Sequence, residues 1–216
     1  MEGLKEMGHP RVSVRALVAF VGALSLAAPA LAENTSPAAV SSNAAALSRI
    51  HIGNFGKVND TYFRGSQPKG NDYKDLAAAG VKTVIDLQID GPSNEAGFVQ
   101  NAGMKFYRIG MTTSKAPTQA QIAQFFDIVN NPANQPVYVH CAGGRHRTGT
   151  MTALYRMTND HWSADQAYQE MKQYHFEGWP DHPVLRSFVY AYNQTPATVP
   201  PAVLATTVVP AAVTTK

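Results

Sequence analysis

One short stretch of the sequence holds residue types whose spacing could do chemistry. Its single cysteine, Cys141, is followed six positions later by Arg147, and two glycines, Gly143 and Gly144, lie between them. A thiolate is a strong nucleophile, and a guanidinium can hold two oxygens of a phosphoryl group in one bidentate contact. The spacing therefore predicts a site that binds a phosphate group and attacks it with sulfur.

The flanking pattern predicts how this stretch is held. An apolar run at 137–139 precedes it and a helix-like run at 150–157 follows it, which is typical of a loop between a strand and a helix. Glycines allow positive φ and close approach, and a helix N-terminus adds partial positive charge. We expect a phosphate-sized dianion to be cradled by the backbone of the loop residues Ala142, Gly143, Gly144, Arg145 and His146.

Two neighbours of the loop are candidates for support. We expect the Thr148 hydroxyl to hydrogen-bond the sulfur, which favours the thiolate, and His140 to fix the start of the loop by hydrogen bonding to the backbone. The alternative for Cys141 is a buried apolar side chain, which is the usual place of a free cysteine. Packing alone does not require glycine, arginine and threonine at these spacings, so the pattern favours a reactive thiol.

This stretch resembles the signature His-Cys-x5-Arg-Ser/Thr-Gly of the cysteine-dependent protein tyrosine and dual-specificity phosphatases. Residues 110–117 and 131–137 make it similar to the atypical dual-specificity phosphatases of the plant and fungal type, and the resemblance extends over about residues 54–193. It implies hydrolysis of phosphate esters through a phosphocysteine on Cys141. It also implies two rival substrates, an inositol pyrophosphate and a phosphotyrosine or other phosphoprotein.

The general acid of this superfamily is missing from its usual place. It is an aspartate on a loop before the cysteine, but the corresponding residues 110–117 include no Asp or Glu. Either Asp90 or Glu95 supplies the proton, or the leaving group needs little protonation. A phosphate leaving group, with a pKa of ~6, departs more easily than a phenolate with a pKa of ~10. This comparison favours pyrophosphate or highly phosphorylated substrates.

Basic residues near the loop suggest the same kind of substrate. Lys115, Arg145 and His146 suit an anion that carries several phosphates, although a solvated rim is the alternative interpretation. By contrast, Arg64 is expected to have a structural role.

Two other patterns are misleading. Trp179-Pro180-Asp181 spells the acid-loop tripeptide of many tyrosine phosphatases, but it follows the signature, so we interpret it as the turn into the last helix with Pro180 near its first position. The histidines and the cysteine lack metal-ligand spacings, so we predict no metal and no cofactor.

The order of predicted elements indicates an α/β fold. A hairpin at 54–68 comes before strands at 81–87, 104–109 and 137–139, and helices are expected at 71–79, 93–102, 118–129, 150–157, 163–174 and 182–192. This alternation predicts the three-layer cysteine-phosphatase fold, with a central, mostly parallel sheet flanked by helices. The reactive loop should lie at the carboxyl end of a central strand.

The ends of the chain differ from its middle. Residues 1–32 are predicted to be a signal peptide, because an apolar run of about 13 residues is shorter than the ~20 that span a membrane. The protein would then be exported, to the periplasm or outside the cell. We further expect a flexible spacer at 33–49, a catalytic domain at 50–194 and a disordered tail at 195–216. The net charge of +3 favours neither nucleic-acid binding nor stable membrane insertion after cleavage.

A second class of function shares part of this pattern. A rhodanese-like sulfur carrier, or a phosphate-binding module without catalysis, also places a loop cysteine between a strand and a helix. The ending Arg147-Thr148-Gly149 favours phosphate over sulfane sulfur.

Overall fold

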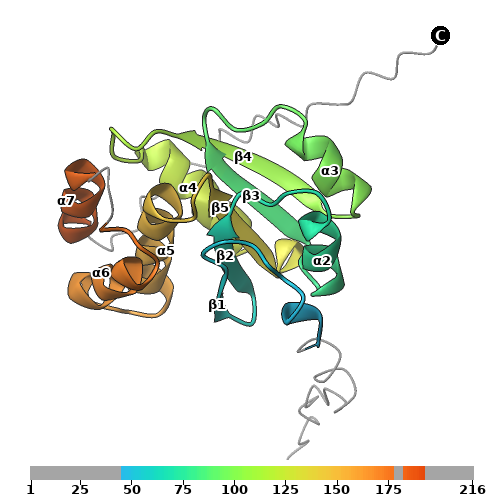
Figure 1. Ribbon diagram of the computed structural model, residues 1–216. Coiled ribbons are helices and arrows are strands. Elements are labelled where there is room, and N and C mark those ends of the chain that lie inside the picture. The colour runs from blue at the N-terminus through green and yellow to red at the C-terminus, as the bar shows by residue number, and fades with distance from the viewer. Residues whose placement is uncertain (1–44, 178–181, 193–216) are drawn as a thin grey trace, which may run out of the picture. The chain divides into compact units, whose positions relative to one another are not determined.

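The computed structural model describes residues 45–177 and 182–192, which contain a five-stranded sheet (Figure 1). The strand order is β1-β2-β5-β3-β4. Strand β1 is antiparallel to β2, and every other neighbouring pair is parallel. The strands are β1 Gly56–Asn59, β2 Tyr62–Ser66, β3 Thr83–Gln88, β4 Lys105–Met111 and β5 Val137–Cys141. The predicted three-layer fold with a mostly parallel sheet is confirmed.

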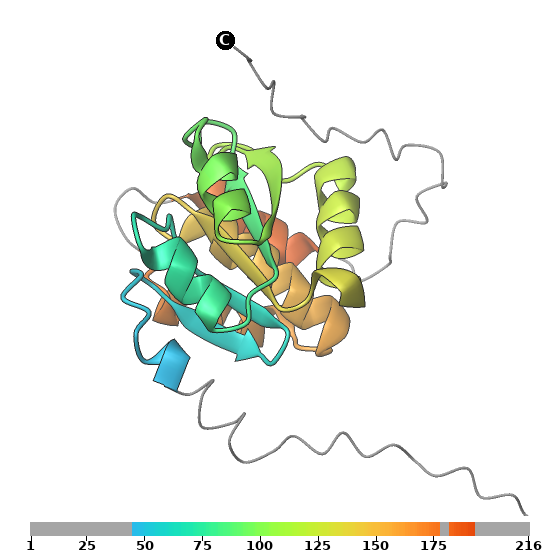
Figure 2. The same cartoon turned by 90° about the vertical axis from the view of Figure 1, so that its right-hand side faces the viewer.

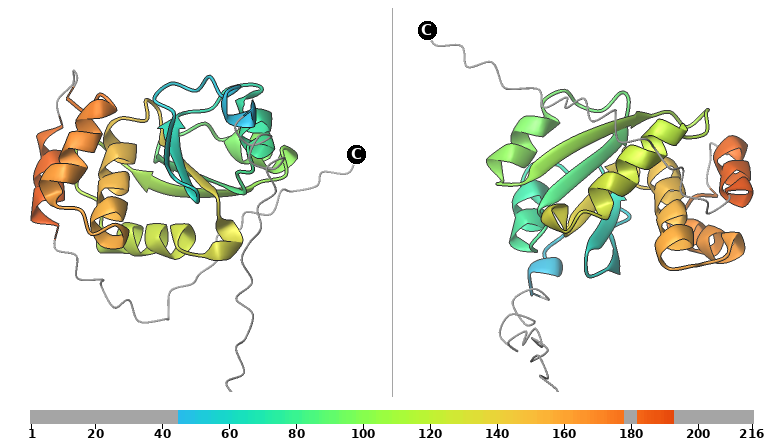
Figure 3. Two further views of the ribbon diagram at one scale, coloured as in Figure 1. Left: turned by 90° about the horizontal axis from the view of Figure 1, so that it is seen from below. Right: turned by 180° about the vertical axis from the view of Figure 1, so that it is seen from behind.

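Helices cover both faces of this sheet. One layer holds α2 Asp72–Ala78 and α3 Glu95–Asn101, which lie in front of the sheet in Figure 2. The other layer, seen from two sides in Figure 3, holds α4 Gln119–Val129, α5 His146–Asn159, α6 Ala164–Gln173 and α7 Pro183–Ala191. A short 3-10 helix, η1 Pro132–Asn134, leads into β5.

Strand β5 divides its side chains between the two layers. Val137, Val139 and Cys141 belong to the apolar core shared with α4 to α7, whereas Tyr138 belongs to the core beside α2 and α3. Successive residues of a strand point to opposite faces of the sheet. The side chains of Cys141 and its neighbour His140 therefore point to opposite faces of the sheet, toward different layers.

Local sequence explains most helix starts. Helices α4 and α6 begin with capping boxes: the hydroxyls of Thr118 and Ser163 each accept a hydrogen bond from the backbone N–H three residues on, and a glutamine side chain accepts one in return. Helix α5 begins at His146, ahead of the run expected from 150, because the end of the reactive loop forms its first turn. Helix α7 begins at Pro183, with His182 at its N-cap, while the prediction about Pro180 falls outside the described residues.

Several predicted segments lie outside the described residues. These are the signal peptide at 1–32, most of the spacer at 33–49, the tripeptide 179–181 and the tail at 195–216. At the end of the expected spacer, Ala46 is buried in the core beside α2, so the packed domain starts before residue 50. In the part of the chain that the structure describes, we find no helix that combines the length and apolar character needed to cross a membrane.

Candidate active site

The carboxyl ends of the parallel strands meet at one edge of the sheet. Cys141 ends β5 and pairs with Ser66, the last residue of β2, while Gln88 at the end of β3 pairs with Met111 at the end of β4. Because β5 lies between β2 and β3, the loops that follow these strands open side by side. This is the edge at which open α/β sheets bind their ligands.

The loop after Cys141 depends on one glycine. Gly144 has a φ of +65°, which side chains rarely adopt, and a Cβ at this position would overlap the backbone of Gly65 in β2. Residues 142–145 can therefore fold tightly against the end of β2 before α5 begins. Arg145 lies at the N-cap of α5 with its side chain exposed.

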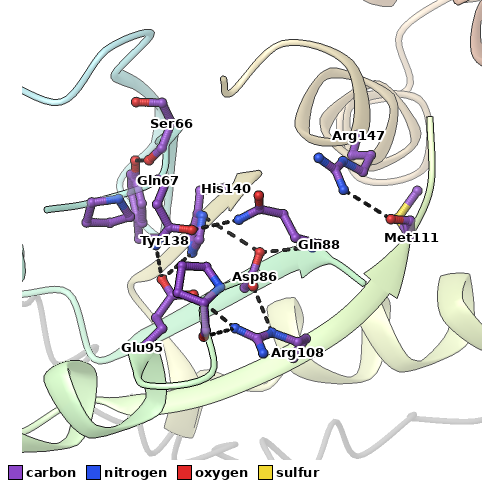
Figure 4. Close-up of polar contacts among 12 residues, drawn as sticks. Ser66, Gln67, Asp86, Gln88, Glu95, Arg108, Met111, Tyr138, His140 and Arg147 are labelled. Atoms are coloured by element: carbon purple, nitrogen blue, oxygen red, sulfur yellow. Dashed lines mark hydrogen bonds and ion pairs between the residues drawn. The ribbon is translucent and has the colours of Figure 1, made fainter. Parts of the chain in front are cut away.

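Arg147 reaches from the first turn of α5 across the site. Its Nη1 donates to the carbonyl oxygen of Met111 at 3.2 Å (Figure 4). The same atom donates to Oδ1 of Asp90, after β3, also at 3.2 Å. The Arg147 side chain is 10% exposed and that of Asp90 is 76% exposed. A carboxylate oxygen thus lies where a substrate phosphate oxygen would meet the guanidinium. The hydrogen bond from Arg147 lowers the pKa of Asp90 below its ordinary value.

Thr148 lies buried in the same turn. Its hydroxyl has no hydrogen-bond partner among the described residues, so the expected bond to the sulfur is not formed in this structure. The hydroxyl proton therefore remains available to the sulfur atom or to a group bound to it.

His140 holds the end of β5 through side chains, not through the backbone as the sequence suggested. Its Nε2 lies 3.0 Å from Oε1 of Glu95, and its Nδ1 lies 3.9 Å from Oδ1 of Asp86. Arg108 contacts both carboxylates, with Nε 2.8 Å from Asp86 and Nη2 3.3 Å from Glu95 (Figure 4).

This group could also be considered as a metal site. Its metal-ligand atoms lie within 4.8 Å of one another and come from Asp86, Glu95 and His140. Because Arg108 already balances the carboxylates, we interpret the group as an ion-pair network.

Glu95 is part of this network and faces away from solvent. Its side chain is 0% exposed and accepts hydrogen bonds from Gln67 and Tyr73. Burial raises the pKa of Glu95, but its interactions with His140, Gln67 and Asp86 together outweigh burial, so the pKa lies below its ordinary value. Burial raises the pKa of the nearby Asp86. Of the two acids suggested by the sequence, Asp90 is therefore the one placed to reach a substrate.

The residues that surround His140 were not predicted from the sequence. They lie on β3, on β4 and just after β2, and none is near the loop in sequence; the three residues are Asp86, Arg108 and Gln67. One signal was visible, namely the charged Asp86 inside the apolar run 81–87. A charge in a buried strand needs a partner, which predicts a network without naming its members.

Comparison with known proteins agrees with this geometry. A family model described as "DSP-PTPase phosphatase fused to NAD+ Kinase" matches residues 49–181, which is more than half of the chain. The chain belongs to this DSP-PTPase family. The matched range includes Asp90 and the loop from Cys141 to Arg147, so the resemblance found in the sequence is confirmed.

Two relatives show how far the DSP-PTPase match extends. The inositol diphosphatase SIW14 of Saccharomyces cerevisiae is 30% identical over 129 residues, which are 57% of this chain and 46% of the yeast protein. The probable tyrosine-protein phosphatase DG1060 of Dictyostelium discoideum is 29% identical over 126 residues, which are 56% of this chain and 75% of that protein. The chain thus spans less than half the length of its yeast relative.

Solved structures of other proteins share the fold. The core catalytic domain of SIW14 from S. cerevisiae, in complex with citrate, gives a TM-score of 0.60 at 25% identity and covers 67% of this chain and 88% of that one. TpbA of P. aeruginosa gives a TM-score of 0.55 at 21% identity and covers 65% of this chain and 86% of that one, which shows the fold alone.

Three basic residues were expected to meet an anion at this DSP-PTPase site, namely Lys115, Arg145 and His146, and His146 differs from that expectation. His146 is half-buried, and its ring packs against those of Phe176 and His182. Burial, together with the charge of His182, lowers the pKa of His146 to about 4. His146 is therefore neutral at neutral pH and adds no positive charge. The exposed side chains of Arg145 and Lys115 remain as candidates to meet additional phosphates.

Proposed function

We propose that this chain is a cysteine-dependent phosphatase that hydrolyses phosphate groups through a phosphocysteine on Cys141. The observation that carries this proposal is the contact between Arg147 and Asp90 at the mouth of the loop. The fold brings a guanidinium from α5 to a carboxylate from the β3–α3 loop, and α5 directly follows the loop that begins at the thiol. A phosphate dianion would replace that carboxylate on the guanidinium and lie over the sulfur.

The reaction proceeds in two displacements. A lone pair of Sγ forms the S–P bond while the P–O bond to the leaving group breaks, and the electron pair stays on the leaving oxygen. Arg147 and the loop N–H groups stabilise the charge on the phosphoryl oxygens. Water then attacks phosphorus, the S–P bond breaks, the thiolate is restored and inorganic phosphate leaves. Asp90, as carboxylate, accepts the proton of that water.

Asp90 also explains why the leaving group matters. Because its pKa is lowered, Asp90 is ionised in the free protein at neutral pH, and its protonated form becomes more abundant only as the pH falls. A phenolate leaving group, with a pKa of ~10, depends on a proton, whereas a phosphate with a pKa of ~6 leaves without one at about 5 kcal/mol less cost. We therefore propose an inositol pyrophosphate as the substrate class, as the name of the SIW14 relative also suggests.

Phosphotyrosine in a protein is the second candidate. The relative DG1060 bears the name of a probable tyrosine-protein phosphatase, and the same thiolate and guanidinium can act on an aryl ester. If phosphotyrosine is the substrate, Asp90 must donate a proton to the leaving phenolate in the first displacement, so the rate should depend strongly on its carboxyl group.

An Asp90→Asn variant tests both the acid and the substrate class. Each protein is assayed with an inositol pyrophosphate and with phenyl phosphate as a function of pH. We expect the unsubstituted protein to prefer the pyrophosphate, and the variant to lose about 100-fold on phenyl phosphate but only about threefold on the pyrophosphate. The matched control is Asp60→Asn, which changes an aspartate that is 92% exposed in the first hairpin. A large preference of the unsubstituted protein for the aryl ester would overturn the pyrophosphate assignment.

We also propose export, on the basis of the predicted signal peptide. If residues 1–32 are removed during secretion, the mature chain begins at Glu33. N-terminal sequencing of the protein recovered from its native host should return Glu-Asn-Thr, and recovery of the full-length chain from the cytoplasm would exclude export.

A further inference from the structure

The first three loop carbonyls after Cys141 are bonded to one segment of the chain, residues 54–67. Three successive carbonyl groups each accept a hydrogen bond from it, and the three donors are of different kinds. The Ala142 oxygen accepts from the backbone N–H of Gln67 at 3.3 Å, the Gly143 oxygen from Nδ2 of Asn54 at 2.8 Å and the Gly144 oxygen from Nη2 of Arg64 at 2.9 Å.

These bonds determine where the loop N–H groups point. In a trans peptide the C=O and the N–H of the same unit point in opposite directions. Carbonyls held toward residues 54–67 therefore turn the N–H groups of Gly143, Gly144 and Arg145 to the other side, into the concavity of the loop. Successive N–H groups aimed inward make an anion site.

Arg64 is an unusual donor for a purely structural contact. It is 0% exposed, and within residues 45–177 and 182–192 its Nε and Nη1 have no hydrogen-bond partner. Its guanidinium lies over the ring of Tyr174, 3.8 Å from the centroid. Burial lowers the pKa of Arg64, and its interactions with Tyr62, Glu170, Tyr174 and, to a smaller extent, Cys141 oppose that change only in part. A buried charge is costly unless something offsets that cost, and the anion of the loop is a candidate to do so.

Asn54 shows a second unusual feature at the same place. Its φ is +53°, in the left-handed region that asparagine tolerates better than most residues. This backbone conformation accompanies the bond from its side-chain amide to the Gly143 carbonyl. Strain of this kind persists where the surrounding structure requires it.

We propose that Asn54 and Arg64 are positioning residues, which aim the N–H groups of Gly144 and Arg145 at the phosphate by holding the Gly143 and Gly144 carbonyls outward. This inference rests on the proposed function, because the loop must bind phosphate for the aim of its N–H groups to matter. Neither residue touches the substrate. Their effect passes through the two peptide units that they hold.

The test measures oxyanion binding directly. Inorganic tungstate, which has the shape of phosphate, is titrated calorimetrically into the purified protein and into Asn54→Ala, Arg64→Met and Arg64→Lys. We expect the dissociation constant for tungstate to rise about tenfold in Asn54→Ala and Arg64→Met, because in each variant one loop N–H group no longer points at the anion. Arg64→Lys should return to within about threefold of the original value, since a single N–H contacts the carbonyl and lysine keeps one donor and the charge.

Two control variants separate positioning from general destabilisation. Asn59→Ala removes a comparable bond from the same hairpin, that of Nδ2 to the Tyr155 hydroxyl at 2.9 Å. Arg156→Met removes a mostly buried arginine that pairs with Glu170 and Asp160, away from the loop. Both should melt at lower temperature yet bind tungstate within about twofold of the original protein.

The outcomes distinguish this inference from the proposed function. If the unsubstituted protein binds no tungstate, both are wrong. If it binds tungstate and the folded Asn54→Ala protein binds it equally well, the positioning role is overturned while the phosphatase proposal stands. Should Arg64→Met fail to fold, Asn54→Ala and Arg64→Lys still decide the question, since the Asn54 side chain is only half-buried and lysine keeps the charge.

Discussion

Replacing Cys141 with serine should reduce turnover of every phosphate substrate by about 10⁴-fold or more, while the protein stays folded and still binds phosphate. The hydroxyl is nearly the size of the thiol, so the buried end of β5 and its core contacts are kept. Serine is ionised far less readily than cysteine, so the nucleophile is lost. Steady-state rates on an inositol pyrophosphate and on phenyl phosphate measure the effect, with circular dichroism as the check on folding.

The same substitution separates phosphatase from sulfur carrier. Labelled phosphate should be trapped on the unsubstituted protein by rapid acid quench and be absent from Cys141→Ser. A rhodanese-like carrier would instead take sulfur from thiosulfate onto Cys141 and show no bound phosphate. A serine variant that keeps more than a few per cent of the phosphatase rate would exclude Cys141 as the nucleophile.

Replacing Arg147 with alanine should reduce kcat/KM by about 10³-fold, and Arg147→Lys should recover little of that loss. The structure places its guanidinium between the Asp90 carboxylate and the Met111 carbonyl, where it can hold a phosphoryl group in line with the sulfur. Lysine offers a point charge without the planar pair of donors. The cost in folding stability should be small, because Asp90 is exposed and water can replace its partner.

A second readout of Arg147→Ala follows from the pKa of Asp90. The arginine lowers that pKa, so its removal should let the pKa rise toward the ordinary value. On phenyl phosphate, the limb of the pH–rate profile that requires protonated Asp90 should then move to higher pH. Arg156→Lys, a substitution on the same helix in an unrelated ion pair, should leave both the rate and the profile unchanged. Retention of the full rate in Arg147→Ala would contradict its role in binding phosphate.

The sequence alone determined the features that depend on neighbouring residues. The reactive loop could be recognised because Cys141 and Arg147 are six positions apart, and a strand before it and a helix after it constrain so short a segment. The helices that begin after Thr118 and Ser163 could be predicted for the same reason, since the donor and acceptor of each capping box lie within one turn. Alternating strands and helices were enough to predict a mostly parallel sheet.

Only the tertiary structure decided which distant residues complete the site. The position of β5 between β2 and β3 brings Asp90 to Arg147 across 57 residues of sequence, and it places Asn54 and Arg64 against loop carbonyls 89 and 80 residues away. It also turns Glu95, a candidate acid from the sequence, into a buried partner of His140. Strand order is set by how the whole core packs, so no local pattern records these pairings.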